Sequence, residues 1–245
     1  MVNHLLKIIQ FYKLLKENDK LAINKIILNN NLNSKQIKIE DFVFNYYSND
    51  IEEKECKYCL DELYKHSLPL ITIEIQNEYY MIKQPHTSIL YWHFEISNLK
   101  HYTGYFELNQ LKMLNDLFPS YMILYHTNNH FHFDLGLIES AVFNKDANHF
   151  FNNTYIVEWY LKTYLIKEKD FNDLIDEYNT ISSKIPTGNK TYAFYKRGNK
   201  YYLYIIIHSE KITPFEAIGF FTISDHKNSL SSIYNDALEK ITQNL

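Results

Sequence analysis

Glycine is scarce in this sequence, with five residues in 245, and the motifs that depend on it do not occur. We find neither GxxxxGK[ST] nor GxGxxG, patterns in which glycines let the backbone cradle phosphate groups. The sequence also contains no HExxH, no GxSxG and no EF-hand loop. These absences disfavour the common nucleotide-binding enzymes.

Cysteine and arginine are also rare. Cys56 and Cys59 are too few for a disulfide framework, and with His66 they form only part of a structural zinc site. Arg197 is the single arginine, and arginine supplies the planar fork for bidentate contacts to phosphate, carboxylate and guanine. Because the net charge is -4 and the pI about 6.3, we expect no nucleic-acid partner.

Long apolar runs are missing too: no window approaches the roughly 18 uninterrupted apolar residues of a membrane span. Lys7, Lys13 and Lys16 interrupt the apolar stretch at the N-terminus, and no small-residue cleavage site follows, so we expect the cytoplasm rather than secretion. Tyrosine is abundant, with 22 residues, and lysine, asparagine and isoleucine are also plentiful. All of these residues have A/T-rich codons, so their abundance indicates a low-GC genome more than a recognition surface.

Hydrophobic periodicity predicts an α+β fold. Alternating residues and turn signals indicate antiparallel sheets built from hairpins at about 70–97, 121–135 and 191–224. We expect amphipathic helices packed on one side of these sheets, at residues 2–17, 20–29, 51–66, 105–118, 153–167 and 170–184, after Thr213, and from Asn228 or Ser229 onward. A single compact unit over residues 1–245 is expected, with two halves at 1–150 and 151–245 as the alternative.

The hairpin expected at residues 121–135, YMILYHTNNHFHFDL, contains the densest group of metal-binding or acid–base side chains. A two-residue turn at Asn128-Asn129 would pair Tyr125 with His132 and Ile123 with Asp134. His126 would then lie on the reverse face. This register places four candidate binding residues on one face of the hairpin: Tyr125, His130, His132 and Asp134.

Two of these histidines and the carboxylate suggest a divalent metal site, for Zn or Mn, at His130, His132 and Asp134. Residues at i, i+2 and i+4 span about 13 Å along a strand, so three of them seldom reach one ion. The alternative is a polar sheet face that meets a partner.

The strand expected at residues 88–97 alternates cleanly and places Tyr91, His93 and Glu95 on its amphipathic face. His93 and Glu95 are spaced for an acid–base pair, about 6.6 Å apart along the strand. More often such residues form the solvated face of an antiparallel sheet. We include all three among the candidate binding residues.

Because no catalytic motif is found, the sequence favours a non-enzymatic protein-binding protein, of the immunity or antitoxin type, from a low-GC bacterium or phage. Its partner would be another protein, and a basic one would complement the mild acidity. This function needs no cofactor. The alternative is a metal-dependent hydrolase or nuclease that uses the cluster at 126–134, with His126 or His93 as added ligands. A structural or regulatory viral protein is a third interpretation.

Overall fold

The computed structural model describes residues 35–46, 71–75, 78–83, 89–90, 93–98, 106–126, 132–137, 147–151, 154–157, 159–223 and 229–243. The helices predicted at 2–17, 20–29 and 51–66 lie outside these residues, as do Cys56 and Cys59. Within the described residues, no helix is long and apolar enough to cross a membrane.

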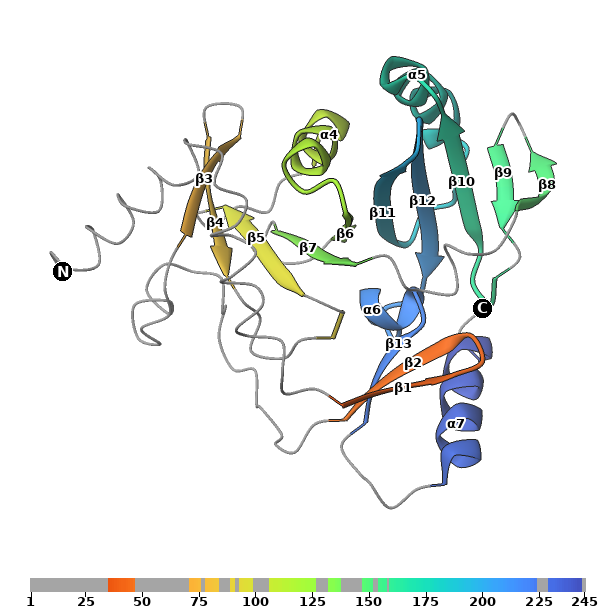
Figure 1. The fold of residues 1–245 in the computed structure, drawn as a ribbon. Helices are drawn as coiled ribbons and strands as arrows, with labels where there is room; N and C mark the ends of the chain where they lie inside the picture. Colours follow the sequence, from red (N-terminus) through yellow and green to blue (C-terminus); the bar gives the residue numbers. More distant parts are fainter. Residues whose placement is uncertain are drawn as a thin grey trace, which may run out of the picture.

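A ten-stranded antiparallel sheet runs through the molecule (Figure 1). β6 and β11 pair at its centre, so strands from residues 1–150 and from residues 151–245 belong to one sheet. In spatial order the strands are β3 (Ile71–Ile75), β4 (Glu78–Lys83), β5 (Phe94–Asn98), β7 (His132–Leu137), β6 (Tyr121–His126), β11 (Asn189–Arg197), β12 (Lys200–His208), β10 (Thr163–Glu168), β9 (Thr154–Val157) and β8 (Ala147–Phe151).

A second sheet has three strands, β1 (Lys35–Ile39), β2 (Phe42–Tyr46) and β13 (Phe220–Ile223). β13 pairs with β2, in parallel, and therefore belongs to this second sheet. The predicted range 191–224 had instead placed it in one sheet with the hairpin of β11 and β12. Gly219 precedes β13 and has a φ of 91°, a backbone conformation that residues other than glycine rarely adopt. Its carbonyl accepts a hydrogen bond from Val43 N.

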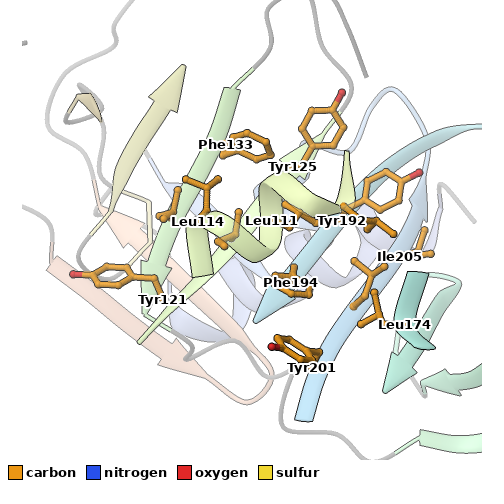
Figure 2. Close-up of a cluster of buried hydrophobic side chains, with 14 of the residues drawn as sticks. Leu111, Leu114, Tyr121, Tyr125, Phe133, Leu174, Tyr192, Phe194, Tyr201 and Ile205 are labelled. Carbon is orange, nitrogen blue, oxygen red and sulfur yellow. The ribbon is translucent and has the colours of Figure 1, made fainter. Parts of the chain in front are cut away.

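Helices cover both faces of the large sheet, rather than one side as predicted. α4 (Leu108–Leu117) and α5 (Phe171–Ser182) bury their apolar faces on one side, in a core of aromatic and aliphatic side chains (Figure 2). The opposite side packs against the small sheet together with α6 (Pro214–Ala217) and α7 (Leu230–Thr242). The central strands of the sheet are therefore buried on both faces.

The helix predicted over residues 153–167 is wrong, because this stretch forms β9 and β10. β10 lies between β9 and β12, and its first four residues are all buried. A strand that buries both faces loses the alternation of apolar and polar residues, and periodicity alone cannot separate it from a buried helix.

The other described helices follow their capping signals. Asp170 accepts a hydrogen bond from Asn172 N at the start of α5, and Ser229 accepts one from Ser232 N at the start of α7. Thr213 and Glu216 form a reciprocal capping box around α6. The α+β class and the antiparallel hairpin sheets are confirmed.

Candidate functional site: a buried histidine and carboxylate cluster

The predicted register of the hairpin formed by β6 and β7 is wrong by one residue. Tyr125 lies opposite Phe133, and Leu124 lies opposite Asp134. This pairing is not the one that a two-residue turn at Asn128-Asn129 would produce. A one-residue slip moves a whole set of side chains to the other face of a sheet.

The slip has a clear physical reason. Tyr125 and Phe133 belong to the apolar core beneath α4, together with Ile123 and Leu135. In the predicted register, Asp134 would have been forced into that core beside Ile123. The observed register places Tyr125 among core residues, so it leaves the candidate site, and brings His126 onto the face of His132 and Asp134.

β5 and the residue that precedes it add two more polar side chains to this face. Glu95 lies opposite Asp134, and His93 lies two residues before it on the same side. His93 and Glu95 are each 2% exposed, so the predicted solvated face is instead buried. Tyr91 and His130, the remaining predicted site residues, lie outside the described residues.

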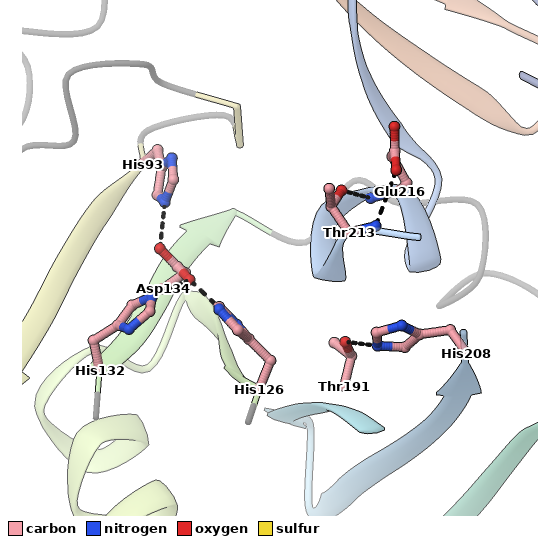
Figure 3. Close-up of polar contacts among 8 residues, drawn as sticks. All are labelled: His93, His126, His132, Asp134, Thr191, His208, Thr213 and Glu216. Carbon is pink, nitrogen blue, oxygen red and sulfur yellow. Dashed lines mark hydrogen bonds and ion pairs between the residues drawn. The ribbon is translucent and has the colours of Figure 1, made fainter. Parts of the chain in front are cut away.

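His93 fixes one side of the Asp134 carboxylate (Figure 3). The Ile89 N–H donates to His93 Nδ1 at 3.2 Å, so this nitrogen must be the unprotonated one. His93 Nε2 therefore carries the proton and donates it to Asp134 Oδ1 at 3.0 Å. The hydrogen bonds thus determine both the tautomer of His93 and the orientation of the carboxylate.

The other carboxylate oxygen faces two imidazoles. Asp134 Oδ2 lies 3.3 Å from His132 Nε2 and 3.8 Å from His126 Nδ1. The two imidazole rings meet edge to face, with centroids 4.7 Å apart. Asp134 Oδ2 accepts no hydrogen bond of regular geometry from any residue that the structure describes.

Asp134 stays ionised despite its burial. Removal from water by itself raises the pKa of its carboxyl, but favourable interactions with His132 and His93 outweigh this effect. Together they hold the pKa of Asp134 well below its usual range. The cluster therefore combines a fixed negative charge with imidazoles that can carry or release a proton.

Among the residues that the structure describes, two sets of three bring their donor atoms within 4.8 Å of one another. One set is His126, His132 and Asp134, and the other is His93, Glu95 and Asp134. In the second set, His93 already uses both ring nitrogens in hydrogen bonds, which disfavours it as a metal ligand, so the first set is the better candidate for a metal site.

A second buried histidine lies on the same face, farther along the sheet. Thr191 is the partner of His126 across β11 and β6, and its hydroxyl lies 3.0 Å from His208 Nε2. His208 Nδ1 donates to the Ser209 carbonyl at 3.0 Å, so Nε2 is the acceptor and Thr191 the donor. Burial lowers the pKa of His208. This pair was not predicted, and its signal is a histidine at the end of an apolar strand.

No family model and no curated protein matches the sequence. The fold is nevertheless similar to that of the yeast Ap4A phosphorylase Apa2. Against the complex with Ap4A the TM-score is 0.61 at 12% identity, over 98% of this chain and 95% of that one. Against the complex with AMP it is 0.56 at 12% identity, over 98% and 94% of the two chains.

This likeness contradicts the prediction of a non-enzymatic immunity or antitoxin protein, which was wrong. The prediction depended on missing local motifs, above all the glycine-rich loops. Such motifs identify only those folds that hold phosphate with backbone N–H groups of one loop. A cluster assembled from paired strands leaves no comparable motif, because its residues meet only after the sheet has formed.

Proposed function

We propose that this protein is an enzyme that binds a nucleotide and cleaves one of its phosphoanhydride bonds. The phosphorus-containing group is transferred to an acceptor at the cluster of His93, His126, His132 and Asp134. The observation that carries the proposal is the pairing of an ionised, buried carboxylate with two imidazoles on one sheet face. The likeness to a phosphorylase crystallised with Ap4A and with AMP supports a nucleotide with phosphoanhydride bonds as the substrate.

In this proposal His132 is the nucleophile, because its Nε2 is the closer of the two imidazole nitrogens to Asp134 Oδ2. Histidine forms covalent intermediates when a neighbouring group orients and activates it. The imidazole keeps its proton on Nε2, the nitrogen that faces Asp134, and attacks phosphorus with the lone pair of Nδ1. A phosphorus–nitrogen bond forms, and the phosphoanhydride bond breaks with its electron pair leaving on the departing phosphate. An acceptor, phosphate or water, then attacks phosphorus and restores the imidazole.

Asp134 and His93 act through His132 rather than on the substrate. The carboxylate holds the imidazole and stabilises the positive charge that develops on it during attack. His93 holds Asp134 Oδ1 and so leaves Oδ2 directed at the imidazoles. His126, with 10% of its side chain exposed, is closer to solvent than His132 or Asp134, which are 2% and 1% exposed. We infer that the substrate approaches from its side.

Chromatography of nucleotides incubated with the purified full chain tests the proposal. With Ap4A and inorganic phosphate we expect release of mononucleotides, reduced about 10³-fold or more in His132→Asn. His208→Gln serves as the matched control, since it changes a buried histidine on the same face outside the cluster. A quench in denaturant at alkaline pH, where a phosphorus–nitrogen bond to imidazole survives, should trap a nucleotide adduct on the wild-type chain by mass spectrometry, and none on His132→Asn. Turnover that survives His132→Asn, or no turnover of Ap4A or ATP, would contradict the proposal.

The expected location in the cytoplasm and the expected lack of a nucleic-acid partner stay predictions from composition. A second protein as partner also stays a prediction, and co-purification from the native host would test it.

A further inference from the structure

We propose that His126, His132 and Asp134 form a binding site for one transition-metal ion of the Zn²⁺ class, and that the metal-bound form is catalytically silent. The binding of the ion stands on the geometry of these three residues alone. Its inhibitory effect rests on the function proposed above, because one of the ligands is the proposed nucleophile.

The spacing of the donor atoms matches a tetrahedral ion. Bonds of about 2.0–2.1 Å from Zn²⁺ to nitrogen and oxygen place neighbouring ligands about 3.3–3.4 Å apart. His132 Nε2 and Asp134 Oδ2 are 3.3 Å apart, and His126 Nδ1 lies 3.8 Å from the same oxygen. All three donor atoms fall within 4.8 Å of one another, so small rotations of the His126 ring complete the set.

The sheet itself removes the difficulty that one strand cannot supply three ligands. His126 ends β6, while His132 and Asp134 occupy alternate positions at the start of β7. Antiparallel pairing therefore replaces the distant third position along one strand with a residue from the neighbouring strand. The metal site predicted at His130, His132 and Asp134 thus becomes a site in which His126 takes part.

The hydrogen bond from His93 suits Asp134 to the role of a metal ligand. His93 donates to Oδ1 and holds the carboxylate so that Oδ2 points at both imidazoles. Partners that orient ligands from outside the coordination sphere are a regular feature of metal sites. Two imidazoles and one carboxylate suit zinc, and three protein ligands leave a fourth position for water or a phosphate oxygen.

Metal binding would silence the nucleophile for a simple chemical reason. A neutral imidazole has one nitrogen with a lone pair and one that carries a proton. When His132 gives its lone pair to the ion, neither ring nitrogen can attack phosphorus. The ion therefore competes with catalysis instead of assisting it.

The binding test uses the purified full chain after chelation, incubated with Zn²⁺ and desalted before elemental analysis. We expect one Zn²⁺ per chain, and Co²⁺ in its place should give the intense visible absorption of tetrahedral coordination. His126→Ala should weaken binding by more than the about 10–100-fold that loss of an outer partner costs. His208→Gln should retain it. A substoichiometric metal content, or equal binding by His126→Ala and wild type, would overturn the site.

The inhibition test measures Ap4A cleavage against added Zn²⁺. We expect wild-type activity to fall as the site fills, and the residual activity of His126→Ala to resist the same concentration. Stoichiometric Zn²⁺ without turnover under metal-free conditions would support the site and refute the proposed function. Turnover that Zn²⁺ does not affect, in a chain that binds no Zn²⁺, would refute the site and retain the function. Turnover that rises with bound Zn²⁺ would overturn the inhibitory role.

Discussion

Two buried polar groups that contain histidine lie on one face of the large sheet. They differ in charge and in how completely their polar atoms are hydrogen-bonded. The Thr191–His208 pair is neutral: the hydroxyl donates to Nε2, and Nδ1 donates to a carbonyl. The cluster around Asp134 contains an ionised carboxylate whose Oδ2 faces two imidazoles without a regular hydrogen bond. Both groups are buried to a similar degree.

This difference separates a structural histidine from a candidate reactive one. Burial alone cannot do so, because a buried polar group is normally satisfied by its neighbours. A buried carboxylate with one oxygen outside any regular hydrogen bond from the described residues departs from this rule, and perturbed ionisable groups of this kind are typical of sites of chemistry or ligand binding. We therefore expect substitutions in the cluster to change activity, and substitutions in the pair to change only stability.

Among the substitutions that test this comparison, Asp134→Asn should lower the free energy of unfolding the most. The folded pKa of Asp134 lies below its unfolded value, so its charge stabilises the fold above that unfolded value, and the contribution disappears as the pH falls through the folded pKa. Removing one partner of a buried charged group costs about 3 kcal/mol, at the low end of the usual range. Denaturant unfolding should show this loss at pH 7 and a smaller difference at acid pH.

Asp116→Asn provides the matched control for this prediction. Asp116 also accepts a hydrogen bond, from Lys112 Nζ at 2.7 Å, but both side chains are well exposed. Exposed pairs contribute little to stability, so we expect no measurable change. Equal losses in the two variants would show that the Asp134 charge has no special role.

Gly136→Ala should have the second-largest effect, through the backbone that orients His93. A Cβ at this position would lie 2.5 Å from Leu90 Cβ, so the chain at Leu90 must shift. Ile89, its neighbour, donates the hydrogen bond that sets the His93 tautomer. Overpacking of this kind costs about 2 kcal/mol, and thermal unfolding measures it.

Turnover gives the more informative readout of the same variant. If the Ile89 contact matters to the cluster, Gly136→Ala should slow the proposed cleavage of Ap4A at temperatures where the variant is fully folded. Gly198→Ala is the control, because its added Cβ meets nothing within 4 Å and only its positive φ of 62° is strained. Comparable turnover of both variants would remove the role assigned to this contact.

Thr191→Val should have a moderate effect, confined to stability. The change keeps the shape of the side chain but removes the hydroxyl that donates to His208 Nε2. A buried acceptor left without its donor costs about 1–2 kcal/mol. Denaturant unfolding should detect this loss, while cleavage of Ap4A per folded chain stays unchanged. A strong loss of turnover would show that the pair belongs to the reactive site.

The comparison also shows what the sequence could and could not predict. His132, Asp134, His93 and Glu95 were found because two-residue alternation assigns side chains to faces within one strand. Which faces of different strands coincide depends on register, and the predicted register depended on an assumed two-residue turn at Asn128-Asn129 that does not match the observed pairing. His126 was therefore placed on the wrong side.

The same contrast, between local signals and pairing of distant residues, holds for the fold. Local signals such as the Asp170 and Ser229 caps and the Thr213 capping box predicted α5, α6 and α7 correctly. β10 was missed because its residues are apolar on both faces. The parallel pairing of β13 with β2 joins residues far apart in the chain, and no local signal specifies it.

His208→Gln should have the smallest effect, visible only as a change in pH dependence. Burial lowers the pKa of His208 below its ordinary value of 6.5, so as the pH falls below that value the unfolded chain takes up a proton that the folded chain refuses. Wild type should therefore lose stability at a rate of at most about 1.4 kcal/mol per pH unit from this residue, and the variant should not. Denaturant unfolding of both chains at pH 7.5 and 5.5 measures the difference, to which the groups common to both chains contribute equally. Parallel pH curves would show that His208 is not held neutral by the fold, and the contrast between the neutral pair and the charged cluster would then fail.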